Sequence, residues 1–423
     1  MTVILLFGSL LFLLGLGVPI FAALGLSSFL VSMESPFIMS TSIPQRMFFG
    51  LDMFGLMAIP YFMFCAEIMG RGQIGKKLVI VCRAFFGHLP GGMAVATVVA
   101  SLIFGAFAGA GVAALVAFGA LIFGLMKEGK YKDEFSAGLI STTSTLAMVL
   151  PPSIVQVVFA TITATSVAAL FLSGIGIGIL YGVVLAGFCV FYGIWKKLPR
   201  LEKVPWRERW KPLRESFWAI TLIFVLLGGI YGGVMSVTEA AGVAAFYAIV
   251  VEVLIYRTIK LKDVFLAAIS AGRMIAMVMI LMSSGAVLAH VMTLLQLPQM
   301  MANLLGDASP LLLLFLINII FLVVGMFIDP TSTIVILTPL LFPVAVAAGI
   351  DPIHVGMLIV LNVSIGMLTP PVGLNLFVSS SIFKLSFSQV TRGVMPFIII
   401  SILLLIILTL FPAITTFLPN TFL

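Results

Sequence analysis

The sequence predicts an all-α polytopic membrane protein whose two halves repeat one layout in inverted orientation. Of its 423 residues, 62% are hydrophobic and 9% are charged, whereas a soluble domain carries roughly 25% charged residues. Two apolar segments are interrupted by Pro151-Pro152 and Pro370-Pro371, which follow breaks at Ala110-Gly111 and Asp329-Pro330 by the same 41 positions. A shift of 219 residues therefore relates the two halves. Broken helices at matched positions of two repeats indicate where a membrane protein binds solutes.

The positive charges indicate topology. The net charge is +7, and every Lys and Arg except Arg46 falls in five ranges: 71–83, 127–132, 196–214, 257–273 and 384–392. Clustered basic loops mark the cytoplasmic side, so we expect a lipid bilayer and no nucleic acid as the partner. The Cys and His residues share no metal-ligand or disulfide spacing, so we expect no catalytic residues, no enzyme and no transition-metal site.

The first half begins with an apolar run over residues 3–31 that lacks Lys and Arg, which predicts an uncleaved first span from a cytoplasmic N-terminus. Residues 51–70 return, and residues 72–90 predict a helix along the cytoplasmic interface. Residues 91–126 are 36 uncharged residues, fewer than the about 40 that two spans and a turn require. We expect a re-entrant hairpin from the cytoplasmic side, and a close-packed pair of small-residue spans is the alternative. Residues 135–165 follow as a helix broken at the diproline.

The first repeat is thus expected to cover residues 1–195. A cytoplasmic amphipathic linker follows at residues 196–215, and residues 216–423 hold one extra helix and the second repeat. Because the extra helix adds one crossing, the second repeat is inverted. Its hairpin, residues 308–350, is expected to enter from the periplasmic side. Its broken helix covers residues 353–383, and the C-terminus is expected outside.

Asp329 is the one acid predicted to lie at mid-depth in the membrane, because the other fourteen acids fall in loops or near the ends of spans. A charge at the bilayer centre costs at least about 3 kcal/mol and needs a partner. No Lys or Arg of the spans is predicted to reach it, so a bound cation, a proton or backbone N–H groups remain. The alternative is that Asp329 caps a helix that starts at Pro330, and the two roles can coexist.

The diproline breaks leave backbone carbonyl oxygens without helical partners, and a cation can satisfy them. Beyond the breaks, Ser153, Gln156 and Asn375 could face the gap between the hairpins, where helix N-termini attract anions. The alternative is that these polar side chains bond their own backbone.

Several motifs carry a resemblance to a known family. They are GMFIDPTS at 325–332, GIDPIHVGM at 349–357, NVSIGMLTPPVGLNLF at 362–377, LPPSI at 150–154 and FGAFAGAG at 104–111. Together they resemble the large membrane subunit of tripartite ATP-independent periplasmic (TRAP) transporters, along essentially the whole chain. The sequence departs from the family pattern at the tip of the first hairpin. This tip is usually serine-rich in the family but holds Ala and Gly here.

The resemblance implies an elevator-type ion-transporter fold in the bacterial inner membrane. The activity implied is sodium-coupled import of a small organic anion such as a dicarboxylate, a sugar acid or a sialate. The implied partners are a small four-helix membrane subunit (Q-type) and a periplasmic substrate-binding protein (P-type). A solitary ion-coupled carrier of the same hairpin fold is the alternative.

By the same resemblance, two or more sodium ions would bind between each hairpin tip and the facing break. The first sodium site would comprise Gly105, Gly109, Ala110, Thr145, Ala147 and Leu150. The second would comprise Gly325, Asp329, Thr331, Ser332, Gly366 and Thr369. Substrate would contact Ser153, Gln156, Asn375, Ala108 and Gly111.

Overall fold

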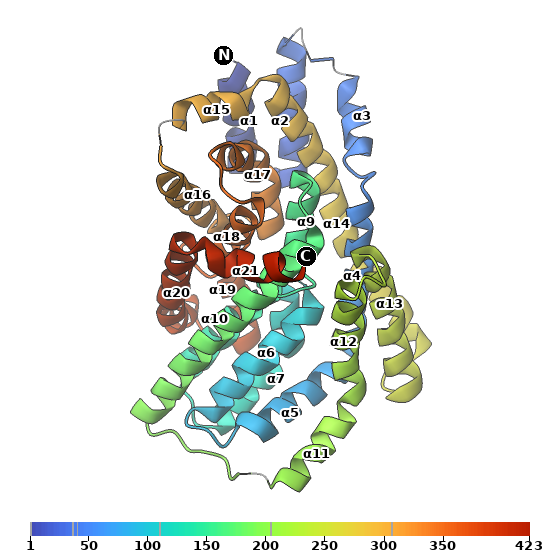
Figure 1. Ribbon diagram of the computed structural model, residues 1–423, viewed down its shortest axis with the longest axis vertical. Coiled ribbons are helices and arrows are strands. Elements are labelled where there is room, and N and C mark those ends of the chain that lie inside the picture. The colour runs from blue at the N-terminus through green and yellow to red at the C-terminus, as the bar shows by residue number, and fades with distance from the viewer. Residues whose placement is uncertain (1, 36–37, 40, 110, 204, 306–307) are drawn as a thin grey trace.

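The computed structural model describes residues 2–35, 38–39, 41–109, 111–203, 205–305 and 308–423, and within these ranges every regular element is helical. This confirms the predicted all-α fold. Six described helices are long and apolar enough to cross a membrane, and the number rises to eight if each of two bent pairs is one span. Figure 1 shows an elongated bundle with the N-terminus and the linker helix α11 (Trp206–Glu215) at opposite ends.

The predicted single span over residues 3–31 is wrong. The segment forms two helices, α1 (Thr2–Gly15) and α2 (Ile20–Glu34), which pack against each other. Between them Gly17 has a φ of 79°, which glycine adopts readily, and Pro19 has no backbone N–H to continue a helix. The chain therefore turns back, and the N-terminus lies at the same end of the molecule as the end of α2 (Figure 1).

A bent pair of helices comes next. α3 (Ser42–Phe49) and α4 (Ala58–Arg71) are connected through the short 3-10 helix η1 (Phe54–Met57), and the chain bends by 55° between α3 and the segment of η1 and α4. α5 (Ile74–Phe86) then packs on α11 at the far end of the molecule (Figure 1).

After α11, the helices α12 (Phe217–Tyr231) and α13 (Val237–Ile249) pack together, and α13 continues into a π-helical segment, η2 (Val250–Ile255). α14 (Leu261–Leu294) is 34 residues long. It leads back to the N-terminal end of the molecule, where α15 (Leu297–Leu305) lies (Figure 1).

Two helical hairpins occupy the predicted regions. The first consists of α6 (Gly92–Ala108) and α7 (Gly111–Glu128), and the second of α16 (Pro310–Gly325) and α17 (Pro330–Ala347). Small residues at the first tip and the Asp-Pro pair at the second end one helix and start the next. α7 and α17 start 219 positions apart, which matches the shift seen in the sequence.

Each hairpin packs against a helix that is broken at a diproline with a cis peptide bond. α8 (Asp133–Val149) and α9 (Ile154–Thr163) flank the first break, and α18 (Pro352–Gly366) and α19 (Leu374–Phe383) flank the second. α8 and α18 also start 219 positions apart. The break follows from the two prolines, which cannot donate to the preceding turn.

The two broken helices run in opposite directions. α9 lies beside α17, where Phe159 meets Phe342 edge to face at 5.4 Å between ring centroids, toward the base of the second hairpin. α19 lies beside α7, where Phe383 stacks on Phe123 at 4.6 Å, toward the base of the first hairpin. Each broken helix thus starts on its own hairpin and ends on the other one.

Three further helices complete the bundle. α20 (Phe387–Leu410) packs along α8, and α21 (Pro412–Phe422) packs on α10 (Val167–Trp195). Buried hydrogen bonds tie the α18 region to this layer, because His354 Nδ1 lies 2.8 Å from Thr415 Oγ1. The core is therefore built where α8 and α18 lie side by side between the two hairpins.

Candidate functional site

Both hairpin tips border one cavity of about 590 Å³. The first tip contributes Gly109 and Gly111, and the second contributes residues 329–332. The facing wall is apolar and comes from α14 and the start of α2: Met274, Met277, Val278, Ile280, Leu281, Pro19, Ile20 and Phe21. Among the lining residues that the structure describes, Asp329 alone carries a charge. We call this space the central cavity.

Four helix N-termini border the central cavity. Gly111, Ile154, Pro330 and Leu374 are the first residues of α7, α9, α17 and α19, and all four line the space. Unpaired N–H groups and the helix dipole give each N-terminus a partial positive charge. Four such ends around one cavity favour an anion there, although no Lys or Arg lines it.

Two helix C-termini meet behind the second tip. A Cβ added at Gly366, the last residue of α18, would lie 2.6 Å from the carbonyl carbon of Gly325, the last residue of α16. Only glycine permits this backbone approach. The carbonyl-bearing ends of two helices thus converge, which favours a hard cation with oxygen ligands. Thr369 lies one turn further on, where its hydroxyl donates to the Ile365 carbonyl at 2.8 Å.

Asp329 is the N-cap of α17, as the helix-capping alternative predicts. Its Oδ1 accepts a hydrogen bond from the Ser332 amide at 3.1 Å, and its Oδ2 accepts one from the Ser332 hydroxyl. The carboxylate is half-buried and borders the central cavity. Thr331 and Ser332 also line the cavity, so three of the residues predicted for the second sodium site lie together at this tip.

The first tip has a similar backbone arrangement with fewer polar side chains. Gly109 has a φ of 60°, and its carbonyl accepts from the Ile154 amide at 3.2 Å. A Cβ on Gly105 would lie 3.0 Å from the Cα of Ala147. Thr145 is buried and donates to the Thr142 carbonyl at 2.8 Å.

Three further residues were predicted around this tip. Leu150 is buried beside the break. Ala110 lies outside the described residues, and for Ala108 only the backbone, at the end of α6, is described.

Of the residues predicted to contact substrate, Gly111 lines the central cavity, whereas the polar residues Ser153, Gln156 and Asn375 do not. Ser153 and Gln156 are fully buried and bond the backbone of the break. The Ser153 hydroxyl donates to the Met148 carbonyl at 2.6 Å, and the Gln156 amide donates to the Val149 carbonyl at 2.5 Å. They satisfy carbonyls that the diproline leaves free, as expected if these side chains bond their own backbone.

Asn375 is also fully buried and absent from the cavity lining. Its amide donates to Ser144 Oγ at 3.0 Å and to the Ser141 carbonyl at 3.4 Å, and so joins α19 to α8. The prediction that it faces the gap between the hairpins is therefore wrong. The polar side chain serves the contact between the two broken helices.

Sequence analysis missed Glu252, which is fully buried in η2, whereas Asp329 is only half-buried. Its Oε1 accepts from the backbone amides of Gln73 at 2.9 Å and Ile74 at 2.8 Å, and Oε2 accepts from the Thr258 hydroxyl. The carboxylate thereby fixes the corner between α4 and α5. The signal in the sequence was an acid in an otherwise apolar stretch.

Comparisons with known proteins agree with this architecture. Residues 7–414 match the family model described as the tripartite ATP-independent periplasmic transporter, DctM component. The solved structure of the YdaH transporter of Alcanivorax borkumensis superimposes with a TM-score of 0.62 at 15% identity and covers 88% of each chain. At that identity the likeness concerns the fold.

Curated relatives are similar along nearly their full length. The C4-dicarboxylate TRAP transporter large permease protein DctM of Vibrio cholerae is 37% identical and covers 99% of this chain and 98% of its own. The ectoine/5-hydroxyectoine TRAP transporter large permease protein UehC of Ruegeria pomeroyi is 38% identical and covers 89% of this chain and 88% of its own. The 2,3-diketo-L-gulonate permease YiaN of Escherichia coli is 35% identical over 97% of both chains. The chain therefore belongs to the DctM family of TRAP transporter large permeases, which are transporters and not enzymes.

Proposed function

We propose that this permease imports a small organic anion and is driven by a sodium gradient. The central cavity carries the proposal, because four helix N-termini surround a space without Lys or Arg. Its volume of about 590 Å³ lies within the usual range for small-molecule sites. The names of relatives that carry C4-dicarboxylates and 2,3-diketo-L-gulonate support an organic acid as the cargo.

Sodium would bind as a transported ion at the two tips. The converging ends of α16 and α18 and the carboxylate of Asp329 supply oxygen ligands for the second site. At the first site the described donors are backbone carbonyls and Thr145. Two or more ions would offset the charge of a carboxylate that has no Lys or Arg partner in the cavity.

The proposed motion is an elevator. The hairpins and broken helices interlock as one body, which would carry the cavity past α2, α4 and α14. The proposed partners are the Q-type four-helix subunit beside those helices and a P-type periplasmic protein that delivers substrate.

The proposed membrane is the bacterial inner membrane. The basic residues near α5 and α11 mark the cytoplasmic end. Because α1 and α2 form a hairpin whose ends lie opposite α11 (Figure 1), the proposed N-terminus is periplasmic, in place of the cytoplasmic one expected from a single first span. The proposed C-terminus remains periplasmic, because α20 leads away from the basic residues at 384–392.

Uptake of radiolabelled succinate into proteoliposomes tests the proposal. The permease is reconstituted with and without its small subunit and binding protein, and with or without an inward sodium gradient. Uptake that requires sodium and all three proteins is the expected result. Sodium-driven uptake by the permease alone would make it a solitary carrier, and uptake that ignores sodium would refute the coupling.

A further inference from the structure

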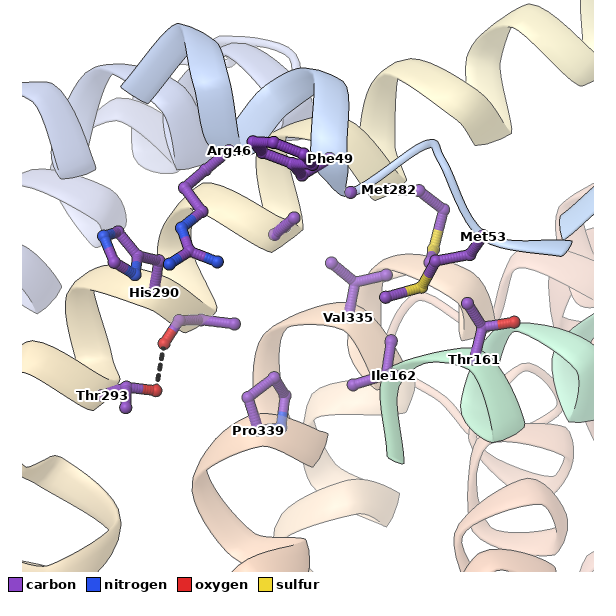
Figure 2. A pocket seen from close by; sticks show the side chains of 14 residues that line it. Arg46, Phe49, Met53, Thr161, Ile162, Met282, His290, Thr293, Val335 and Pro339 are labelled. Atoms are coloured by element: carbon purple, nitrogen blue, oxygen red, sulfur yellow. Dashed lines mark hydrogen bonds between the residues drawn. The ribbon is translucent and has the colours of Figure 1, made fainter. Parts of the chain in front are cut away.

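A second cavity of about 410 Å³ lies between α3 and α14 on one side and α9 and α17 on the other (Figure 2). Its lining includes Arg46, Met53, Thr161, His290 and Val335. We call it the outer cavity, because α3 lies at the end of the molecule opposite the basic linker helix α11 (Figure 1). None of the residues assigned above to sodium or substrate lines it.

The outer cavity contains the one Lys or Arg that lies outside the five basic clusters of the chain, Arg46. Figure 2 shows its side chain extending from α3 toward the ring of His290 on α14. No carboxylate of the described residues pairs with Arg46. A guanidinium in an apolar-walled space with no acidic partner is suited to a carboxylate, which it can bind through two parallel hydrogen bonds.

Three helices contribute residues to both the outer and the central cavity. On α14, Leu281 lines the central cavity and Met282 the outer one, and on α17 the corresponding residues are Ser332 and Val335. On α9, Val155 and Ile162 line the central and outer cavities, respectively.

One apolar contact lies between α14 and α17. A Cβ added at Gly285 would lie 2.0 Å from Val335 Cγ1, so Val335 fills the space above the glycine. Gly285 and Val335 both line the outer cavity, so this packed contact belongs to its wall.

We propose that Arg46 and His290 form an entry site that binds a carboxylate of the transported anion before it reaches the central cavity. The inference rests on the proposed function, because it takes the cargo to be an organic acid. A phospholipid phosphate shares the chemistry of an oxyanion. The three helices that line both cavities favour the carboxylate of the cargo.

The test compares how fast an anionic and a cationic thiol reagent react inside the outer cavity, and it does not require transport. Thr293 lines the cavity, so Thr293→Cys introduces a thiol there, while Cys65, Cys82 and Cys189 are all buried. The purified protein in nonionic detergent is treated with an anionic and a cationic methanethiosulfonate reagent. The ratio of the two reaction rates is then compared between Thr293→Cys alone and the same protein with Arg46→Gln or Arg46→Lys. Arg392→Gln, an exposed change of equal charge, is the matched control.

Arg46→Gln is expected to lower the anionic-to-cationic rate ratio by on the order of tenfold, because a nearby unit charge acts oppositely on the two reagents. Arg46→Lys and Arg392→Gln should leave the ratio nearly unchanged. Succinate should protect the thiol when Arg46 is present. An unchanged ratio in Arg46→Gln would overturn the site, and protection by glycerol 3-phosphate but not by succinate would make it a lipid headgroup site.

Proteoliposomes then test the role in entry. Where the wild-type complex takes up succinate, Arg46→Gln should raise KM several-fold with little change in kcat, and Arg46→Lys should restore KM. An unchanged KM would overturn the entry role. If the wild-type complex takes up no succinate, a C4-dicarboxylate is excluded as the cargo, while the reagent ratio still decides whether the outer cavity attracts anions.

Discussion

Replacing Glu252 should loosen the corner between α4 and α5. Glu252→Ala removes the acceptor of the Ile74 amide, which is buried, and of the partly buried Gln73 amide. A buried N–H left without a partner costs about 1–3 kcal/mol, and the exposed side of the corner lets water replace part of the Gln73 bond. The expected loss of local stability is about 2–4 kcal/mol.

Glu252→Gln keeps Oε1, the atom that accepts both amides. It loses the charge and the acceptor of the Thr258 hydroxyl, so a cost of about 1 kcal/mol is expected.

Hydrogen exchange followed by mass spectrometry can measure this change in a peptide that covers residues 72–80. A local loss of about 3 kcal/mol accelerates amide exchange on the order of a hundredfold where opening is local. Glu239→Ala, which removes an exposed acid of the neighbouring α13, should leave this peptide unchanged. Wild-type exchange rates in Glu252→Ala would refute the role assigned to the buried carboxylate.

Three further changes test the tips and the break. Gly366→Ala should cost about 1–3 kcal/mol of stability and abolish uptake, because the added Cβ would lie 2.6 Å from the Gly325 backbone. In Gly325→Ala the nearest atom lies at 3.5 Å, so the effect should be smaller. Equal melting temperatures of the two variants would contradict the contact. Gln156→Leu should lower the melting temperature in detergent, with a cost of about 1–3 kcal/mol, because the Val149 carbonyl loses this donor while the Met148 carbonyl keeps the Ser153 hydroxyl. A wild-type melting temperature would show that water replaces the amide. Asp329→Asn keeps a good N-cap but should weaken sodium dependence of uptake about tenfold, and unchanged dependence would leave Asp329 as a cap alone.

The hairpins and breaks were predictable because the residue types at these positions allow few backbone conformations. A diproline cannot continue a helix, and Asp-Pro starts one, so α17 and α9 begin close to where the sequence indicates. The first span was not predictable from hydropathy. Apolar residues continue on both sides of Gly17 and Pro19, so the composition of a single span and that of a tight hairpin are the same.

The polar residues of the site were harder to assign because a buried amide can serve either a ligand or the chain. Gln156 lies next to a break that frees carbonyls, and the nearest acceptors are its own backbone. Glu252 directly follows the neutral residues 240–251, and its partners are amides 179 and 178 residues away. Local sequence carries no information about such distant contacts.

The crossing of the broken helices bears on how the chain is synthesised. Ser141 on α8 contacts Ser379 on α19 at 2.5 Å, across 238 positions of sequence. When α8 leaves the ribosome, α19 has not yet been translated. Ser141 can therefore contact Ser379 only after the last fifth of the polypeptide has been reached. A chain that ends before α19 therefore has a first hairpin that lacks its neighbour.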